Sequence, residues 1–359
     1  MVRLAAGQAE QQGKAEQPGG ADRQRRQDRP LLDHPGSHVQ HRPVTIPFGN
    51  PRRFRRLQPR NSGRRPTIAS ALLIVNRRAR SGAGAAEEAQ AALEAAGLTV
   101  LSFEPPERMS CAEAIIAGAR AHPVDRVVLG GGDGTLNAAI PGLLELGLPF
   151  GILPLGTAND LARSLGIPFD IAAAARVIAE AAPRPLDLGE VNGHAFFNVA
   201  SIGFSAELAT ELKAEAKRRF GTLGYAIAAF SLLRRARPFT AVLTHDGVVE
   251  RVKTIQVSVG NGRHYGGGMT IAEDARPDDG VLDVYSLEVT HWWRLVALLP
   301  WLRRGTQGRW RDVRAFRTTA LELHTRRPRP INTDGELTAW TPAVFRLRPA
   351  ALRVFAPAP

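Results

Sequence analysis

Residues 126–135 read RVVLGGGDGT, and this stretch largely determines which fold the chain can adopt. The apolar run Arg126–Leu129 is typical of a buried strand, and a helix is predicted directly after the glycines, from Leu136 to Leu146. Glycines let backbone N–H groups approach an anion because they carry no Cβ, and the start of the helix adds partial positive charge. The stretch therefore predicts an anion-binding turn over Gly130–Thr135. The alternative is a tight strand-to-helix turn without a ligand.

The aspartate in this turn narrows the class of ligand. Asp133 would repel a bare phosphate, so a cation must lie between them, and a Mg²⁺-bound nucleotide is a better candidate than free phosphate. The turn is not a Walker loop, because it lacks the Gly-Lys-Ser/Thr ending, and the protein-kinase motif set is absent from the sequence.

A second segment, Pro154–Arg163, repeats this construction after the next predicted strand. Gly156 supplies the turn, and Thr157 is predicted to cap the following helix. Open α/β sheets bind ligands at the ends of neighbouring strands, so we expect the two loops to face one crevice. Taken alone, Thr157–Asp160 fits a helix cap as well as it fits a binding loop.

The rest of the pattern predicts two parts. Strands predicted over 70–76, 98–103, 126–129 and 150–153 alternate with helices over 85–96, 110 onward and 136–146, which indicates an α/β domain with a parallel sheet. After about Pro185 the strand-like runs are 195–202, 240–243, 254–259, 281–287 and 344–355, interrupted by helical stretches over 205–219, 223–235 and 291–303. We therefore predict an α/β domain over 67–185 and a β-rich, sandwich-like domain over 186–359.

Composition excludes several classes of protein. The chain has 359 residues and a formal net charge of +13, but residues 1–66 alone hold 14 Lys or Arg and 5 Asp or Glu. This segment is predicted to be a disordered basic leader, and a nucleic-acid arm or an anionic-lipid tether remains an alternative for it. The single cysteine excludes a disulfide framework. No apolar run reaches the ~20 residues of a membrane span, and the N-terminus lacks a secretory signal core.

Two acidic segments are further candidates. Asp334-Gly335-Glu336 fits a hairpin turn, but it also places two carboxylates close together. Asp274, Asp278, Asp279 and Asp283 form an acidic loop without the spacing of an EF-hand. A bound cation and a bare type I turn explain that loop equally well.

The two glycine loops together resemble the diacylglycerol/sphingosine lipid kinase catalytic-domain family, and the bacterial soluble lipid kinases in particular. Five more motifs support the resemblance in the right order, so that it runs from about Leu72 to the C-terminus. They are Asn76 with the residues around it (75–82), the segments 198–204 and 277–283, the glycine-rich stretch 260–269, and Asp334-Gly335-Glu336.

The resemblance implies a role for each of these residues. ATP would be bound by Asn76, Arg77, Arg78, Ala79, Arg80, Gly130, Gly131, Gly132, Asp133, Gly134, Thr135 and Thr157, with Ser102 as a looser candidate. Glu336 would be the base, and Asp334 would orient the acceptor hydroxyl or bind metal. Asp133, Asp334 and Glu336 are thus the predicted catalytic residues. A structural Mg²⁺ would use the Asp279 carboxylate with the carbonyls of Arg276 and Val281. Ser205 stands where many relatives carry an acid.

The resulting hypothesis is an ATP-dependent lipid kinase whose first expected reaction converts diacylglycerol to phosphatidic acid, with phosphatidylglycerol and sphingoid bases left open as acceptors. The alternatives are an NAD kinase-like enzyme, which shares the Gly-Gly-Asp-Gly core, and a non-catalytic nucleotide- or lipid-binding module. We expect a cytoplasmic protein that associates peripherally with membranes, with no specific nucleic-acid partner. Its oligomeric state is not predicted.

Two segments are candidates for the membrane contact. Tryptophans at 292, 293, 301 and 310 lie among arginines, a combination that suits a membrane interface. The segment 213–237 is basic at both ends around an apolar centre. Either segment could instead pack into the core of the β-rich domain.

Overall fold

The computed structural model describes residues 69–76, 84–103, 108–208, 237–289 and 291–358, except for the side chain of Trp292. The predicted leader, the candidate ATP contacts Arg77 to Arg80 and most of the helical stretches predicted between 205 and 235 lie outside the described residues.

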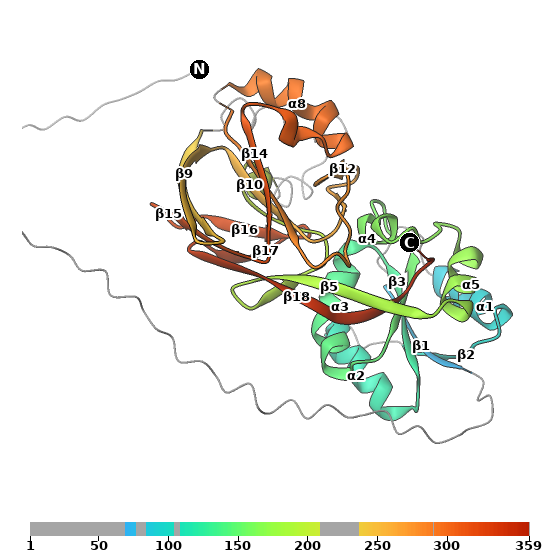
Figure 1. The fold of residues 1–359 in the computed structure, drawn as a ribbon. Helices are drawn as coiled ribbons and strands as arrows, with labels where there is room; N and C mark the ends of the chain where they lie inside the picture. The colour runs from blue at the N-terminus through green and yellow to red at the C-terminus, as the bar shows by residue number, and fades with distance from the viewer. Residues whose placement is uncertain (1–68, 77–83, 104–107, 209–236, 290, 359) are drawn as a thin grey trace, which may run out of the picture. The chain divides into compact units, whose positions relative to one another are not determined.

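The first part of the fold is a parallel sheet in the order β2-β1-β3-β4, covered by helices (Figure 1). Helices α2 and α3 pack together on one face, and α1 and α5 pack together on the other. The strands are β1 (Ser70–Val75), β2 (Thr99–Ser102), β3 (Arg126–Gly131) and β4 (Phe150–Pro154). The helices are α1 (Gly84–Ala95), α2 (Cys111–Ala121), α3 (Asp133–Leu146), α4 (Asp160–Ser164) and α5 (Ile171–Glu180).

Local sequence accounts for these elements. The apolar runs of β1, β3 and β4 are buried on both faces, as expected for a parallel sheet between helices. Helix α2 begins with the predicted capping box, in which Ser110 and Glu113 bond each other's backbone N–H groups. Helix α3 ends at Gly147, whose left-handed backbone favours glycine.

The sheet continues beyond the α/β part through a long strand from far along the chain. Strand β18 (Ala343–Phe355) pairs with β4 at Val354–Phe150 and runs antiparallel to β5 (Pro183–Val191). On its other half β18 pairs with β15 (Ala320–Thr325), which leads to β8 (Phe239–His245) and β9 (Val248–Thr254). The predicted domain boundary after residue 185 thus falls inside β5, and that boundary stays a prediction.

A second, antiparallel sheet completes the fold in the order β14-β13-β10-β7-β16-β17. Its strands are β7 (Val199–Gly203), β10 (Gln256–Gly260), β13 (Leu282–Leu287), β14 (Val313–Thr318), β16 (Pro330–Thr333) and β17 (Glu336–Trp340). Side chains from both sheets, such as Ile202, Val257, Leu323 and Phe345, form one buried cluster. The predicted α/β part followed by a β-sandwich is therefore confirmed.

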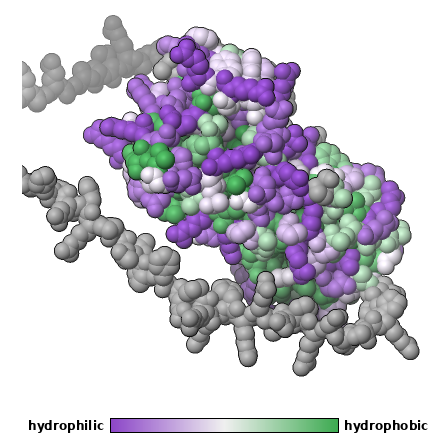
Figure 2. Space-filling view, in the orientation of Figure 1, coloured by the Kyte–Doolittle hydropathy of each residue, from purple (hydrophilic) through white to green (hydrophobic). Residues whose placement is uncertain are grey.

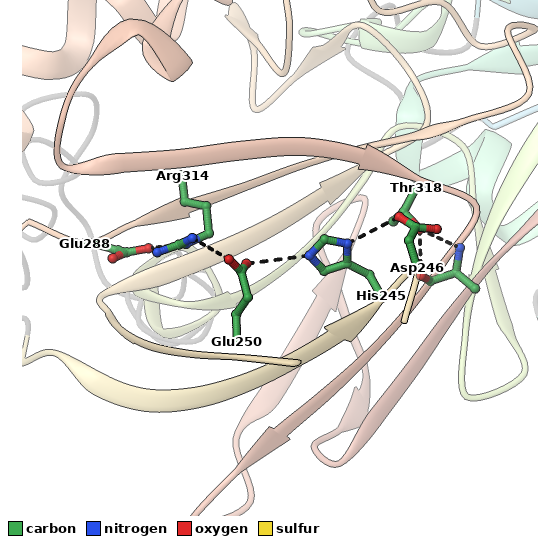
Figure 3. Close-up of polar contacts among 7 residues, drawn as sticks. His245, Asp246, Glu250, Glu288, Arg314 and Thr318 are labelled. Atoms are coloured by element: carbon green, nitrogen blue, oxygen red, sulfur yellow. Dashed lines mark hydrogen bonds and ion pairs between the residues drawn. The ribbon is translucent and has the colours of Figure 1, made fainter. Parts of the chain in front are cut away.

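Polar contacts join the two sheets at one edge of the sandwich (Figure 3). Arg314 on β14 bonds Glu250 on β9 and also Glu288, while His245 on β8 lies between Glu250 and Asp246 and stacks on Phe316. Smaller elements surround the sandwich. They are β6 (His194–Phe196), the hairpin β11 (His264–Tyr265) and β12 (Met269–Thr270), helix α8 (Trp292–Arg304) and the 3-10 turn η2 (Gln307–Arg309). No helix among the described residues is long and apolar enough to cross a membrane.

Candidate active site

The two glycine loops lie against each other, backbone to backbone. A Cβ placed on Gly156 would lie 2.4 Å from the Cα of Gly132, and a Cβ on Gly131 would lie 2.6 Å from the side chain of Thr135. Because real Cβ atoms do not approach backbone so closely, only glycine allows this contact. The two loops therefore meet at the ends of β3 and β4, as expected for neighbouring strands.

A carboxylate ties the two loops together. Asp133, in the first turn of α3, accepts hydrogen bonds from the backbone N–H groups of Asp160 and Leu161, each at 3.1 Å. These N–H groups belong to the start of α4, so Asp133 caps α4 from the neighbouring loop. The aspartate thus has a structural function beside its predicted one.

The prediction that Thr157 caps α4 is wrong. The residue that precedes α4 is Asn159, which has a left-handed backbone with φ 50° and makes no side-chain cap bond. Its side chain accepts the N–H of Gly156 at 2.9 Å and donates to the carbonyls of Pro154 and Gly156. Asn159 therefore holds the loop closed, and Thr157 is left exposed, where a ligand can reach it.

Asp160 is a buried acid that the sequence did not single out. One carboxylate oxygen accepts the N–H of Gly267 at 3.0 Å, and the other is buried without a partner among the described residues. Burial raises the pKa of Asp160 to about 6, and the nearby Asp133 carboxylate adds to this rise. The position of Asp160 directly after Asn159, in the second glycine loop, was the only sign in the sequence that it could belong to the site.

Asn76 connects the end of β1 to the first glycine loop. Its side-chain amide donates to the hydroxyl of Thr135 at 2.9 Å, and its backbone N–H donates to the carbonyl of Gly130 at 2.9 Å. The predicted nucleotide contacts Asn76, Gly130 to Thr135 and Thr157 are thereby gathered at one edge of the sheet. Ser102 is the last residue of the neighbouring strand β2.

Asp334 and Glu336 differ sharply in environment. Asp334 is half-buried, and its carboxylate accepts the N–H groups of Phe197, Asn198 and Val199 at 2.7, 3.0 and 2.9 Å. Burial raises its pKa to about 6 against the lowering effect of these bonds. This carboxylate therefore fixes the backbone of residues 197–199, which leads into β7. Glu336, two residues later, is exposed.

Glu336 lines a cavity of about 430 Å³ next to the first glycine loop. The cavity is bounded on one side by α3, through Gly134, Asn137, Pro141 and Leu144, and on the other by residues of β6, β17 and β18. The Asn137 amide reaches the carbonyl of Thr333 at 3.5 Å, which joins α3 to the Asp334 turn. Glu336 therefore lines the same cavity as Gly134 at the start of α3, although about 200 residues separate them in the sequence.

The acidic loop holds its carboxylates mostly in ion pairs. Arg317 pairs with Asp274 and Asp283, while Arg184 and Arg276 pair with Asp278. Asp279 has no ion pair among the described residues. Its two oxygens accept the N–H groups of Arg276 and Val281 at 3.1 and 3.2 Å.

Burial raises the pKa of Asp279, and Asp187 adds to the rise, so a cation here would relieve an unfavourable charge. In the described part of the chain no three acidic, histidine or cysteine side chains are grouped to hold a metal. An ion at Asp279 would therefore depend on backbone carbonyls, which suits the oxygen preference of Mg²⁺.

Ser205 lies within a buried polar network and not at the loops. Its N–H and hydroxyl donate to Gln256, whose amide donates to Ser258 and Tyr285. The nearby Glu207 pairs with Arg329 at 3.1 Å. The structure brings neither residue to Asp133 or Glu336.

Two families match the chain, one for each part of the fold. A diacylglycerol kinase catalytic domain matches residues 70–191, and the YegS C-terminal NAD kinase beta sandwich-like domain matches residues 198–356. The first range contains both glycine loops, and the second contains Asp334 and Glu336. Fold and site together define a lipid kinase of the diacylglycerol kinase-like class.

The similar proteins agree with this class. A protein named "Probable lipid kinase YegS-like" from Pseudomonas syringae pv. syringae (strain B728a) is 34% identical over 248 residues, which are 68% of this chain and 79% of that protein. One of the same name from Stenotrophomonas maltophilia (strain K279a) is 36% identical over 63% of this chain and 76% of that protein. The crystal structure of a "putative diacylglycerol kinase" from Bacillus anthracis str. Sterne has a TM-score of 0.67 at 27% identity, covering 83% of this chain and 98% of that one. The chain belongs to the family of YegS-like lipid kinases.

Proposed function

We propose that this lipid kinase transfers the γ-phosphoryl group of ATP to the hydroxyl of diacylglycerol, which yields phosphatidic acid and ADP. The observation that carries the proposal is the position of Glu336, which lines one cavity with Gly134 at the start of α3. The proposed base for the acceptor hydroxyl and the proposed phosphate site would thus open into one cavity.

The phosphates of ATP would lie at the start of α3. The N–H groups at the start of a helix generally lack acceptors in a preceding turn, although that of Thr135 already donates to the carbonyl of Gly132 at 2.9 Å. The helix adds partial positive charge there. Gly134 leaves open space, since a Cβ on it would meet no atom within 4 Å. The exposed Thr157 and the Asn76–Thr135 pair would border the nucleotide.

Each proposed catalytic carboxylate has a separate role. Asp133 keeps free lone pairs beside its two N–H bonds and would hold the nucleotide's Mg²⁺, which supplies charge neutralisation during phosphoryl transfer. Glu336 takes the proton of the acceptor hydroxyl as that oxygen bonds to the γ-phosphorus and the bond to ADP breaks. Asp334 acts as a positioning residue, because its carboxylate is occupied by three N–H groups.

The remaining assignments follow from the same proposal. Arg77 to Arg80 would contact ATP, and Asp279 with the carbonyls of Arg276 and Val281 would hold a structural Mg²⁺. Residues 67–185 would form the ATP-binding domain and residues 186–359 the lipid-presenting domain. The cavity along α3 continues from Glu336 to the apolar Pro141 and Leu144, which suits an acceptor with an apolar tail.

The decisive test uses γ-labelled ATP with a total lipid extract and identifies the labelled product. Parallel reactions contain diacylglycerol, phosphatidylglycerol, a sphingoid base or NAD as the only acceptor. Labelled phosphatidic acid supports the proposal. Labelled NADP would establish the NAD kinase alternative, and ATP binding without any labelled product would establish a non-catalytic module.

A further inference from the structure

Helix α8 has two apolar faces, and only one of them is buried. Leu295, Leu298 and Leu302 pack into a core cluster beneath the helix. In the described part of the chain, ten large hydrophobic residues are exposed, and four of them lie on this single helix. They are Trp293, Val296, Leu299 and Trp301, exposed by 53%, 48%, 42% and 37%.

The spacing places three of these residues in one stripe. Trp293, Val296 and Leu299 recur every three residues, so they lie along one side of the helix. Trp301 lies to one side of this stripe and makes an edge contact with Trp310, at a ring-centroid distance of 5.1 Å. A concentrated apolar stripe on a surface helix marks a contact with another phase or molecule.

The surroundings of the stripe are basic. Arg303 and Arg304 occupy the last turn of α8, are exposed, and form no ion pair with any described residue. Figure 2 shows strongly hydrophilic residues, together with paler ones, over the region where Figure 1 places α8. Tryptophan beside arginine is typical of helices that lie in the headgroup region of a bilayer.

A hollow next to the stripe is a candidate binding site for a lipid headgroup. It has a volume of about 770 Å³ and is lined by Trp293, Arg294, Arg309, Trp310, Arg311 and Asp312. Asp312 is engaged by Arg294, and Arg309 pairs with the exposed Glu273 at 3.2 Å. Arg311 is exposed and has no ion pair among the described residues, so the lining keeps an excess of positive charge.

Hydrogen bonds connect this region to the candidate site. The hydroxyl of Thr270 on β12 donates to the carbonyl of Arg303 at 3.0 Å. The loop between β11 and β12 donates from Gly267 to Asp160, whose N–H binds Asp133. The β11–β12 hairpin therefore contacts both the end of α8 and the second glycine loop.

We infer that the outer face of α8 docks this kinase on an anionic bilayer. The stripe enters the boundary between headgroups and acyl chains, and the arginine-lined hollow receives a lipid phosphate. This inference deepens the proposed function, since it rests on an acceptor lipid that lies in a membrane.

The test is co-sedimentation of the full chain with vesicles of phosphatidylcholine, with or without phosphatidylglycerol. Wild type binds the mixed vesicles, and salt weakens the binding. The Trp293→Ala/Leu299→Ala double variant loses at least about tenfold in partition coefficient, because two apolar anchors are removed. Arg303→Gln/Arg304→Gln loses about fivefold or more per charge on the anionic vesicles only.

Matched controls lie elsewhere on the surface. Val248→Ala/Val249→Ala removes two exposed apolar side chains from β9, and Arg326→Gln/Arg327→Gln removes two adjacent exposed arginines. Both control variants bind vesicles like wild type. Equal loss in the controls and the α8 variants would overturn the inference.

Two further outcomes also overturn it. One is wild-type protein that does not bind anionic vesicles. The other is a dimer that dissociates on Trp293→Ala while vesicle binding is unchanged, because a second copy then covers the stripe. Phosphorylation of a short-chain, water-dispersed diacylglycerol is unaffected by the α8 variants, so failure of docking and failure of the kinase proposal are distinguishable.

Discussion

The carboxylate of Asp133 accepts the backbone N–H of Asp160 at 3.1 Å. This bond crosses from the loop after β3 to the loop after β4, so the geometry of the two loops is set jointly. The residue proposed to face the nucleotide's cation is therefore also the residue that fixes the second loop.

Asp133→Asn should separate these two roles. The amide keeps one acceptor for the two N–H groups, so we expect a loss of about 1 kcal/mol in the free energy of unfolding. Removing the charge that faces the cation should lower kcat by about 100-fold or more. Urea unfolding and lipid phosphorylation measure the two effects. A variant with near wild-type kcat would exclude the proposed role of Asp133.

Gly156→Ala should push the two loops apart. Its Cβ would lie 2.4 Å from the Cα of Gly132 and 2.7 Å from the Asn159 side chain. Relief of this overlap should cost about 1–3 kcal/mol in the free energy of unfolding and weaken ATP binding. Calorimetry and equilibrium dialysis provide the measurements.

Gly134→Ala is the matched control for the effect of that substitution on stability. Nothing lies within 4 Å of its Cβ position, and it stands in helix α3, so alanine should stabilise the fold by about 0.5–1 kcal/mol. If phosphates lie at the start of α3, the same variant binds ATP more weakly. Unchanged affinity would place the nucleotide elsewhere.

Glu336→Gln should damage catalysis without damaging the fold. The side chain is exposed, so the free energy of unfolding should change by no more than about 0.5 kcal/mol. Loss of the general base should lower kcat by about 10²–10⁴-fold, with the Kd for ATP unchanged. Single-turnover kinetics with diacylglycerol provide the readout.

Asp334→Ala should show the opposite pattern. Three N–H groups lose their acceptor at once, and each one left unsatisfied in the interior costs about 1–3 kcal/mol. We expect a large fall in the midpoint of thermal unfolding, with activity lost only as far as the fold is lost. Full stability with no activity would instead indicate direct contact with the acceptor.

Asp160 should make the stability of the protein depend on pH. Burial raises its pKa to about 6 from an ordinary value of 3.8. Between these values the native state holds a proton that the unfolded chain has released, so the free energy of unfolding falls as pH rises through this window.

Asp160→Asn should flatten this dependence without abolishing it, because burial also raises the pKa of Asp334 to about 6. Urea unfolding between about pH 4 and pH 7, without nucleotide or divalent ions, tests the expectation. A slope unchanged by Asp160→Asn would contradict the raised pKa.

Local pattern was sufficient for much of the fold. The apolar runs of β1, β3 and β4 and the capping box of α2 each carry their own signal, because burial on both faces and side-chain capping are local properties. Strand β5 was missed over its whole length, and Pro183 and Pro185 at its start weaken the strand pattern. Prolines are tolerated in edge strands, and β5 pairs there on one side only, with β18.

The sequence supplied candidate residues for the site but not their contacts. The glycine loops carry a local signal of their own, whereas Glu336 became a candidate base only through the family resemblance. Asp334 and Glu336 differ in role because only Asp334 accepts the N–H groups of residues 197–199. This contact joins residues more than 130 positions apart in the sequence. The roles of Asn159 and Asp160 likewise depend on loop geometry, which residue type alone does not determine.

Strand β18 has to be synthesised before the sheet that contains β4 can be completed. One edge of β4 pairs with β3, and the other pairs with β18 at Val354, about 200 residues further along the chain. Until a ribosome has made that segment, a partly built sheet presents an open hydrogen-bonding edge to other nascent chains. We therefore expect this enzyme to depend on holding chaperones during translation, and to reach its native state slowly in refolding because of such distant pairing.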